Sequence, residues 1–242
     1  MLFLAGRIIP ENSRRLGRDV AAPFPHAILA GMDVPGEIIA AIATGAGRAA
    51  VGIVRLSGPG SHALALRLCP GLRRPPPDRR LARCRVVHPV DGRALDDALV
   101  VFFREGASFT GEEAVEIHGH GGPAVLDGLL HACLDAGARP ARAGEFTRRA
   151  LAAGRIDLAQ AEAVALLVEA PGDAAVAVAL EALSGRPSAE VARLEGRLLD
   201  GVAELEASLD FAEEDGVRVD VAAVAGSLAA AATEAAAEAP AR

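Results

Sequence analysis

The pattern of apolar residues changes once along this chain, near Gly154, and the change limits the folds available to it. Before Gly154, short β-branched runs alternate with helical stripes and with turns that contain Gly or Pro. After Gly154, strand-type runs disappear and apolar residues recur at helical spacing, up to an alanine-rich segment from Val221. The sequence therefore predicts an α+β protein, with an N-terminal α/β domain over residues 35–154 and an all-α helical domain over residues 155–242.

The elements of the first domain are predicted from their composition and their bounding turns. Strands are expected at residues 38–44, 51–57, 84–90, 98–103 and 114–118. One helix is expected from Ser61, a candidate N-cap, and a second over residues 123–136, closed by Gly137. Asp91-Gly92 predicts a hairpin turn.

The segments outside this domain are also interpreted from their patterns. Helices are expected at residues 158–170, 174–183, 189–209 and from 221, with a kink or break at Pro187. Residues 1–34 lack a clean period, and we interpret them as a disordered or mis-annotated leader.

Composition excludes several classes of function. The formal net charge of −7 argues against a surface that coats nucleic acid, so any RNA contact is expected to be local. The three cysteines, Cys69, Cys84 and Cys133, lack CxxC spacing, which disfavours a disulfide framework and a zinc site. No apolar run reaches the ~20 residues that span a bilayer. We therefore expect a cytoplasmic protein with no membrane partner.

The absence of one residue type excludes a specific chemistry. The sequence contains no lysine, and its 25 basic residues are all arginine. The phosphate-binding loop of GTPases ends in Gly-Lys-Ser/Thr. These 242 residues therefore cannot form that loop.

The segment Gly45–Ala50 matches the loose dinucleotide fingerprint GxGxxA, but its surroundings do not fit. A dinucleotide fold needs a helix after the glycines, whereas Val51–Val54 is typical of a strand. The acid expected about 20 residues later is also missing, because no Asp or Glu occurs between Glu37 and Asp78. A Rossmann-type site is not predicted.

Six blocks of the sequence occur in a fixed order: Ile42–Gly58, Ser108–Glu113, Glu116–Pro123, Arg142–Ala150, Asp157–Ala163 and Leu209–Glu214. Together these blocks resemble the MnmE (TrmE) family of bacterial tRNA-modifying GTPases. The opening block differs from the family's by Gly45-Ala46 in place of Pro-Pro and Ala49-Ala50 in place of Gly-Gly. The resemblance implies a folate-binding domain of the aminomethyltransferase type, followed by part of the family's helical domain, with the GTPase domain outside these residues.

The resemblance also implies a ligand and partners. It implies that Arg55, Glu116 and Arg155 bind the cofactor, 5-formyltetrahydrofolate or another tetrahydrofolate, and Arg155 stands where the family usually has lysine. It implies a homodimer that acts with the flavoprotein MnmG on the wobble uridine of tRNA. GTP, Mg²⁺ and K⁺ are expected only in a full-length protein. No catalytic residue and no metal ligand is assigned.

Alternatives remain open at this point. Glu116 and Arg55 are equally expected to form a structural ion pair, because a buried acid is normally paired. His118 and His120 lie two residues apart and would ligate a metal if a third ligand converged, although glycine-flanked histidines more often bond to turns. The chain as a whole is alternatively a free-standing folate-dependent aminomethyltransferase-like protein or a non-catalytic dimerising fragment.

Overall fold

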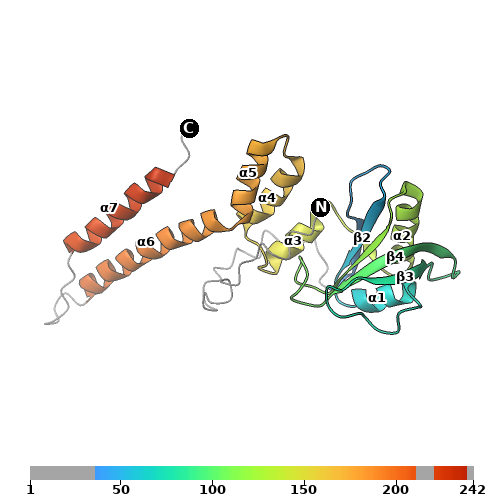
Figure 1. Ribbon diagram of the computed structural model, residues 1–242. Coiled ribbons are helices and arrows are strands. Elements are labelled where there is room, and N and C mark those ends of the chain that lie inside the picture. Colours follow the sequence, from blue (N-terminus) through green and yellow to red (C-terminus); the bar gives the residue numbers. More distant parts are fainter. Residues whose placement is uncertain (1–35, 211–220, 239–242) are drawn as a thin grey trace. The chain divides into compact units, whose positions relative to one another are not determined.

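The computed structural model describes residues 36–210 and 221–238 (Figure 1). The leader predicted for residues 1–34 and most of the acidic block Leu209–Glu214 lie outside the described residues. The chain divides into two compact units, residues 1–161 and residues 162–242.

The first unit is built on a six-stranded sheet with the strand order β3-β4-β5-β2-β1-β6. Neighbouring strands are antiparallel, except for β1 and β6, which are parallel. The strands are β1 (Ile39–Ile42), β2 (Val51–Ser57), β3 (Ala82–Val87), β4 (Ala94–Phe103), β5 (Ala114–His120) and β6 (Arg139–Pro140).

Two helices pack on the sheet, and the core lies between them and the strands. Helices α1 (Ser61–Leu68) and α2 (Pro123–Asp135) contribute Leu68 and Leu129 to this core, and both side chains are fully buried. They meet strand residues such as Val54 and Ile117, which are also fully buried. Because side chains alternate along a strand, the residues next to these in sequence point to the opposite face. Arg55, Glu116 and His118 are therefore on the face opposite the core.

The N-terminus of α1 is stabilised by a residue from a distant loop. The backbone N–H of Gly60 donates to Glu113 Oε2 at 3.0 Å, which places a carboxylate at the positive end of the helix dipole. Ser61 was predicted as the N-cap, and this is wrong, because Gly60 occupies that position and α1 begins at Ser61. Among the described residues, the buried Ser61 hydroxyl has no hydrogen-bond partner.

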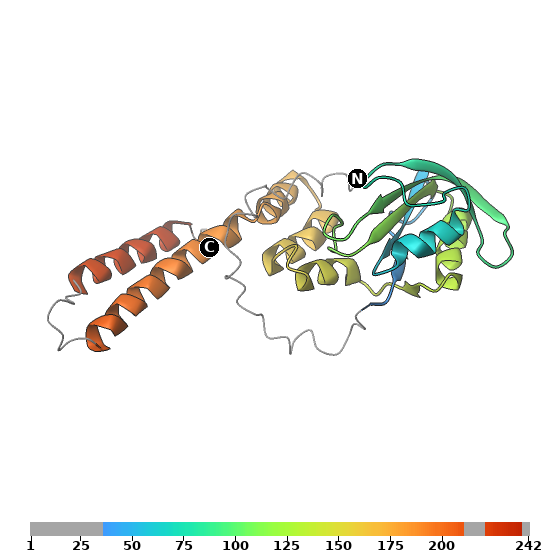
Figure 2. The same ribbon diagram turned by 90° about the horizontal axis from the view of Figure 1, so that it is seen from below.

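From Glu145 onward, the regular elements of the described residues are all helices. These helices are α3 (Glu145–Ala152), α4 (Leu158–Glu169), α5 (Asp173–Leu183), α6 (Arg186–Asp210) and α7 (Val221–Glu238). Within the second unit, α6 and α7 lie side by side in both views (Figures 1 and 2). The break predicted at Pro187 is confirmed: α5 ends at Leu183, and Pro187 falls in the first turn of α6, where a missing N–H is tolerated.

The architecture confirms the predicted fold class, an N-terminal α/β unit followed by helices. Within residues 36–210 and 221–238, no helix is long and apolar enough to cross a membrane.

Candidate functional site

Two of the three predicted cofactor-binding residues are in direct contact. Arg55 on β2 lies opposite Glu116 on β5 in the antiparallel register. Both Nε and Nη2 of Arg55 donate to Glu116 Oε1, at 2.9 and 2.6 Å. Each side chain is 15% exposed, so the pair is largely enclosed but still reachable from solvent. The structure thus contains the Arg55–Glu116 ion pair that the sequence analysis gave as the alternative to ligand binding.

The other oxygen of Glu116 bonds to His118. His118 Nε2 lies 3.0 Å from Glu116 Oε2, and the two side chains point to the same face because they are two residues apart on β5. Burial by itself raises the pKa of Glu116, but the His118 hydrogen bond and the nearby Arg55 charge outweigh it, so this pKa lies below its ordinary value. Glu116 is therefore an ionised acceptor at neutral pH.

The third predicted residue, Arg155, lies just beyond α3. Its backbone N–H donates to the carbonyl oxygen of Ala150 at 2.9 Å. Its stem packs against Gly111, where an added Cβ would lie 3.3 Å from the Arg155 carbons. In the part of the chain that the structure describes, no hydrogen bond or ion pair joins Arg155 to Arg55 or Glu116, and its buried Nε has no partner.

A second charged cluster, centred on Glu145, was not predicted from the sequence. Glu145 is fully buried at the start of α3. It accepts hydrogen bonds from Nη1 and Nη2 of Arg139 at 3.0 and 2.7 Å, and from Nη2 of Arg149 at 3.1 Å. The hydrogen bond from Arg139 has the largest effect, and together these donors lower the pKa of Glu145 to about 2, against the opposing effect of burial.

Arg149 extends this cluster to the sheet and to the loop before β5. Its Nη1 donates to both carboxylate oxygens of Glu112, at 3.1 and 3.0 Å, and to the carbonyl oxygen of Glu37 at 3.0 Å. Glu112 in turn accepts from the Ser57 hydroxyl at 2.7 Å. The four-residue spacing of Glu145 and Arg149 on a helix was the available sequence signal for this contact. The cluster fastens α3 to the edge of the sheet.

The two histidines considered as metal ligands bond to different carboxylates. His118 contacts Glu116, whereas Nδ1 of His120 lies 2.7 Å from Asp96 Oδ1, and its backbone N–H donates to Asp96 Oδ2 at 2.7 Å. No group of three or more His, Cys, Asp or Glu side chains that could hold a metal occurs among the described residues. Within residues 36–210 and 221–238, the two histidines are therefore not joined by a third metal ligand.

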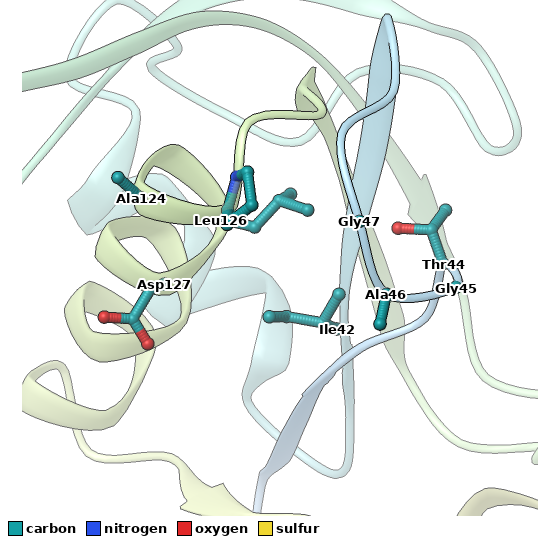
Figure 3. Close-up of a pocket in the computed structure, with 9 residues that line it drawn as sticks. Ile42, Thr44, Gly45, Ala46, Gly47, Ala124, Leu126 and Asp127 are labelled. Atoms are coloured by element: carbon teal, nitrogen blue, oxygen red, sulfur yellow. The ribbon is translucent and has the colours of Figure 1, made fainter.

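A pocket of about 600 Å³ lies elsewhere on the first unit (Figure 3). It is bounded by the loop after β1 on one side and by the start of α2 on the other, with Ile42 and Leu126 pointing into it. Most of its lining is apolar, and Thr44 and Asp127 contribute polar atoms. None of the three predicted site residues lines this pocket.

Fold and site together define a two-part protein, in which an α/β sheet unit bears a partly enclosed charged site and is followed by a helical unit. Comparison with known families identifies both parts. Residues 38–155 match the family described as GTP-binding protein TrmE N-terminus, and residues 158–239 match the MnmE helical domain. The chain therefore belongs to the TrmE/MnmE family.

Individual relatives agree with this assignment. The chain is 49% identical to the tRNA modification GTPase MnmE of Azoarcus sp. (strain BH72) over 181 residues, which is 75% of this chain and 39% of that protein. It is 43% identical to the mitochondrial 5-taurinomethyluridine-tRNA synthase subunit GTPB3 of Rattus norvegicus over 189 residues, covering 78% of this chain and 38% of that protein. The chain thus spans less than two fifths of the length of these relatives.

Proposed function

We propose that this chain is the folate-binding, dimerising portion of an MnmE-type tRNA-modifying GTPase. In this proposal the whole protein acts with MnmG on the wobble uridine of tRNA. The names of the relatives, a tRNA modification GTPase and a taurinomethyluridine synthase subunit, support the tRNA role. GTP, Mg²⁺ and K⁺ belong to a GTPase domain of the whole protein, because these residues contain no lysine for a phosphate-binding loop.

The folate proposal rests on the hydrogen bonding of the Glu116 carboxylate. Glu116 Oε1 already accepts two hydrogen bonds from Arg55, and Oε2 accepts one from His118. A carboxylate oxygen has two lone pairs, so Oε2 keeps an acceptor position that no described residue uses. An ionised, partly exposed carboxylate with acceptor capacity suits a pterin ring, which presents adjacent N–H donors.

Arg55 and Arg155 also suit a folate ligand. Guanidinium groups bind carboxylates with two parallel hydrogen bonds, and the glutamate tail of a folate carries carboxylates. Within the described residues, the buried Nε of Arg155 is a donor without an acceptor, and a buried donor of this kind is normally satisfied. We therefore assign the pterin to Glu116 and the anionic part of the ligand to Arg55 and Arg155. The bound folate supplies a one-carbon unit, and the protein residues bind and orient it.

The proposed homodimer rests on the family resemblance, in which the folate lies at or near a subunit interface. The free-standing aminomethyltransferase alternative is less well supported, because it gives no reason for the helical domain matched at residues 158–239.

A binding measurement on Glu116→Gln tests the proposal. The substitution keeps the shape of the side chain but replaces one acceptor oxygen with a donor that faces a ligand donor. We expect affinity for 5-formyltetrahydrofolate to fall by on the order of 2 to 4 kcal/mol, or roughly 30- to 1000-fold, in calorimetric titration. A melting curve on the same samples separates lost binding from lost folding.

The control is Asp97→Asn, which removes the acid of the exposed Arg83–Asp97 pair on β3 and β4. This variant should bind folate as the wild type does. If Glu116→Gln melts at a lower temperature yet binds folate normally, Glu116 has only a structural role and the assigned site is wrong.

A further inference from the structure

His118 has a position that the proposed folate site does not yet use. In the described part of the chain, His118 and Arg55 are the two residues whose side chains bond to the Glu116 carboxylate. His118 lies between Ile53 on β2 and Leu99 on β4, and its side chain is 12% exposed. Its Nε2 is 3.0 Å from an ionised carboxylate oxygen, so this nitrogen carries the proton and donates.

The two oxygens of Glu116 are not equally available to a ligand. A ligand with two adjacent N–H donors binds a carboxylate best with one hydrogen bond to each oxygen. Oε2 has an unused acceptor position, but both lone pairs of Oε1 are taken by Arg55. Two-point binding therefore requires Arg55 to give up at least one bond to Oε1, whereas His118 can stay in place.

Arg55 also has a neighbour other than Glu116. Its guanidinium carbon lies 5.7 Å from the centre of the Phe146 ring on α3. An aromatic face at this distance attracts a guanidinium group. Once Arg55 is released from Oε1, His118 becomes the protein donor that still fixes the carboxylate.

We propose that His118 is a positioning residue of this site, which holds Glu116 through Oε2 while a ligand with paired N–H donors, such as a pterin, displaces Arg55 from Oε1. The inference rests on the proposed folate site and adds a residue and an exchange to it. In the free protein both Arg55 and His118 hold the Glu116 carboxylate, whereas in the complex His118 keeps its hydrogen bond while Arg55 gives up one or both of its own. Replacing His118 should therefore reduce folate affinity strongly but lower the melting temperature only slightly.

Titration of 5-formyltetrahydrofolate into wild type, His118→Leu and His118→Gln, each with a melting curve, tests this inference. Leucine suits a position between Ile53 and Leu99 but has no donor, so we expect affinity to fall roughly 10- to 100-fold with only a small change in Tm. Glutamine places an amide N–H near the position of Nε2, and it should bind within a few-fold of wild type. His120→Leu is the matched control, because His120 lies on the same strand and bonds to Asp96 instead.

This experiment distinguishes a failure of the His118 inference from a failure of the proposed folate site. If wild type binds folate and His118→Leu binds it equally well, the inference is wrong and the folate site stands. If wild type does not bind folate, both are wrong. Should His118→Leu fail to fold, His118→Asn replaces it, since its amide is too short to reach Oε2. Weak binding by the asparagine variant with normal binding by the glutamine variant supports the inference, and equal binding by both contradicts it.

Discussion

At the scale of single residues, Glu116 and Glu145 show how two acids in neighbouring motif blocks take different roles. Glu145 is fully buried, and it accepts from Arg139, Arg149 and the backbone N–H of Arg142. Glu116 is partly exposed and retains acceptor capacity. The sequence places an acid in each block but cannot show which one is enclosed, because enclosure depends on the packing of α3 against the sheet.

The buried charge of Glu145 predicts a loss of stability in acid. Its pKa is lowered to about 2 in the folded protein, so its contribution is complete above the ordinary value near 4.5 and is lost as the pH falls towards 2. We expect the wild-type free energy of unfolding to decrease between about pH 5 and pH 2, by on the order of 2 to 3 kcal/mol from this residue. Urea titrations followed by circular dichroism at each pH measure this decrease.

Glu145→Gln is the comparison that isolates the effect. This variant should be less stable at pH 7, because it leaves Arg139 and Arg149 with one fewer charged acceptor, and its stability should depend less on pH in the same window. If the free energy of unfolding depends on pH in the same way in both proteins, the Glu145 charge does not stabilise the fold.

At the scale of elements, the sequence predicts the first five strands, the helices α1 and α2 and the helical half, but not α3 or β6. In the strands and the other helices, the spacing of apolar residues indicates which face is buried. The buried face of α3 instead contains Glu145 and Arg149, so it lacks an apolar stripe. β6 has only two residues, one of them Pro140. Its pairing with β1 is set by the tertiary fold.

The turn between β2 and α1 gives a prediction at this scale. Gly58 has a φ of +132°, and a Cβ added there would lie 2.5 Å from the carbonyl oxygen of Glu37. Gly58→Ala should therefore destabilise the protein by on the order of 2 to 4 kcal/mol, measured by urea unfolding.

Gly92→Ala is the matched control for this turn. Gly92 also has a positive φ, +67°, but an added Cβ would meet no atom within 4 Å. Its substitution should be destabilising by only about 1 kcal/mol. If both substitutions lower the free energy of unfolding equally, the close contact with the Glu37 carbonyl oxygen does not add to the destabilisation at Gly58.

At the scale of the whole molecule, the sequence accounts for only part of the side-chain geometry around the candidate site. The proximity of Arg55 and Glu116 follows from pairing of the strands that carry them. The direct contact of His118 with Glu116 was not anticipated, and neither was the packing of the Arg155 stem against Gly111. Side-chain geometry of this kind depends on register and on loop packing, which a single sequence does not specify.

Dimerisation is a prediction for the whole chain. We expect sedimentation to show a dimer at micromolar concentration, and folate to favour it if the ligand lies near the subunit interface. A monomer at that concentration, both with and without 5-formyltetrahydrofolate, would contradict the proposed dimer.

Chemical-shift mapping can show whether folate binds at the Arg55–Glu116 pair. Backbone amide signals of the labelled chain are recorded as 5-formyltetrahydrofolate is added. We expect saturable shifts centred on Arg55, Glu116 and Arg155, with smaller changes at Thr44 and Asp127, which line the other pocket. Shifts confined to that pocket, or no saturable shifts at all, would contradict it.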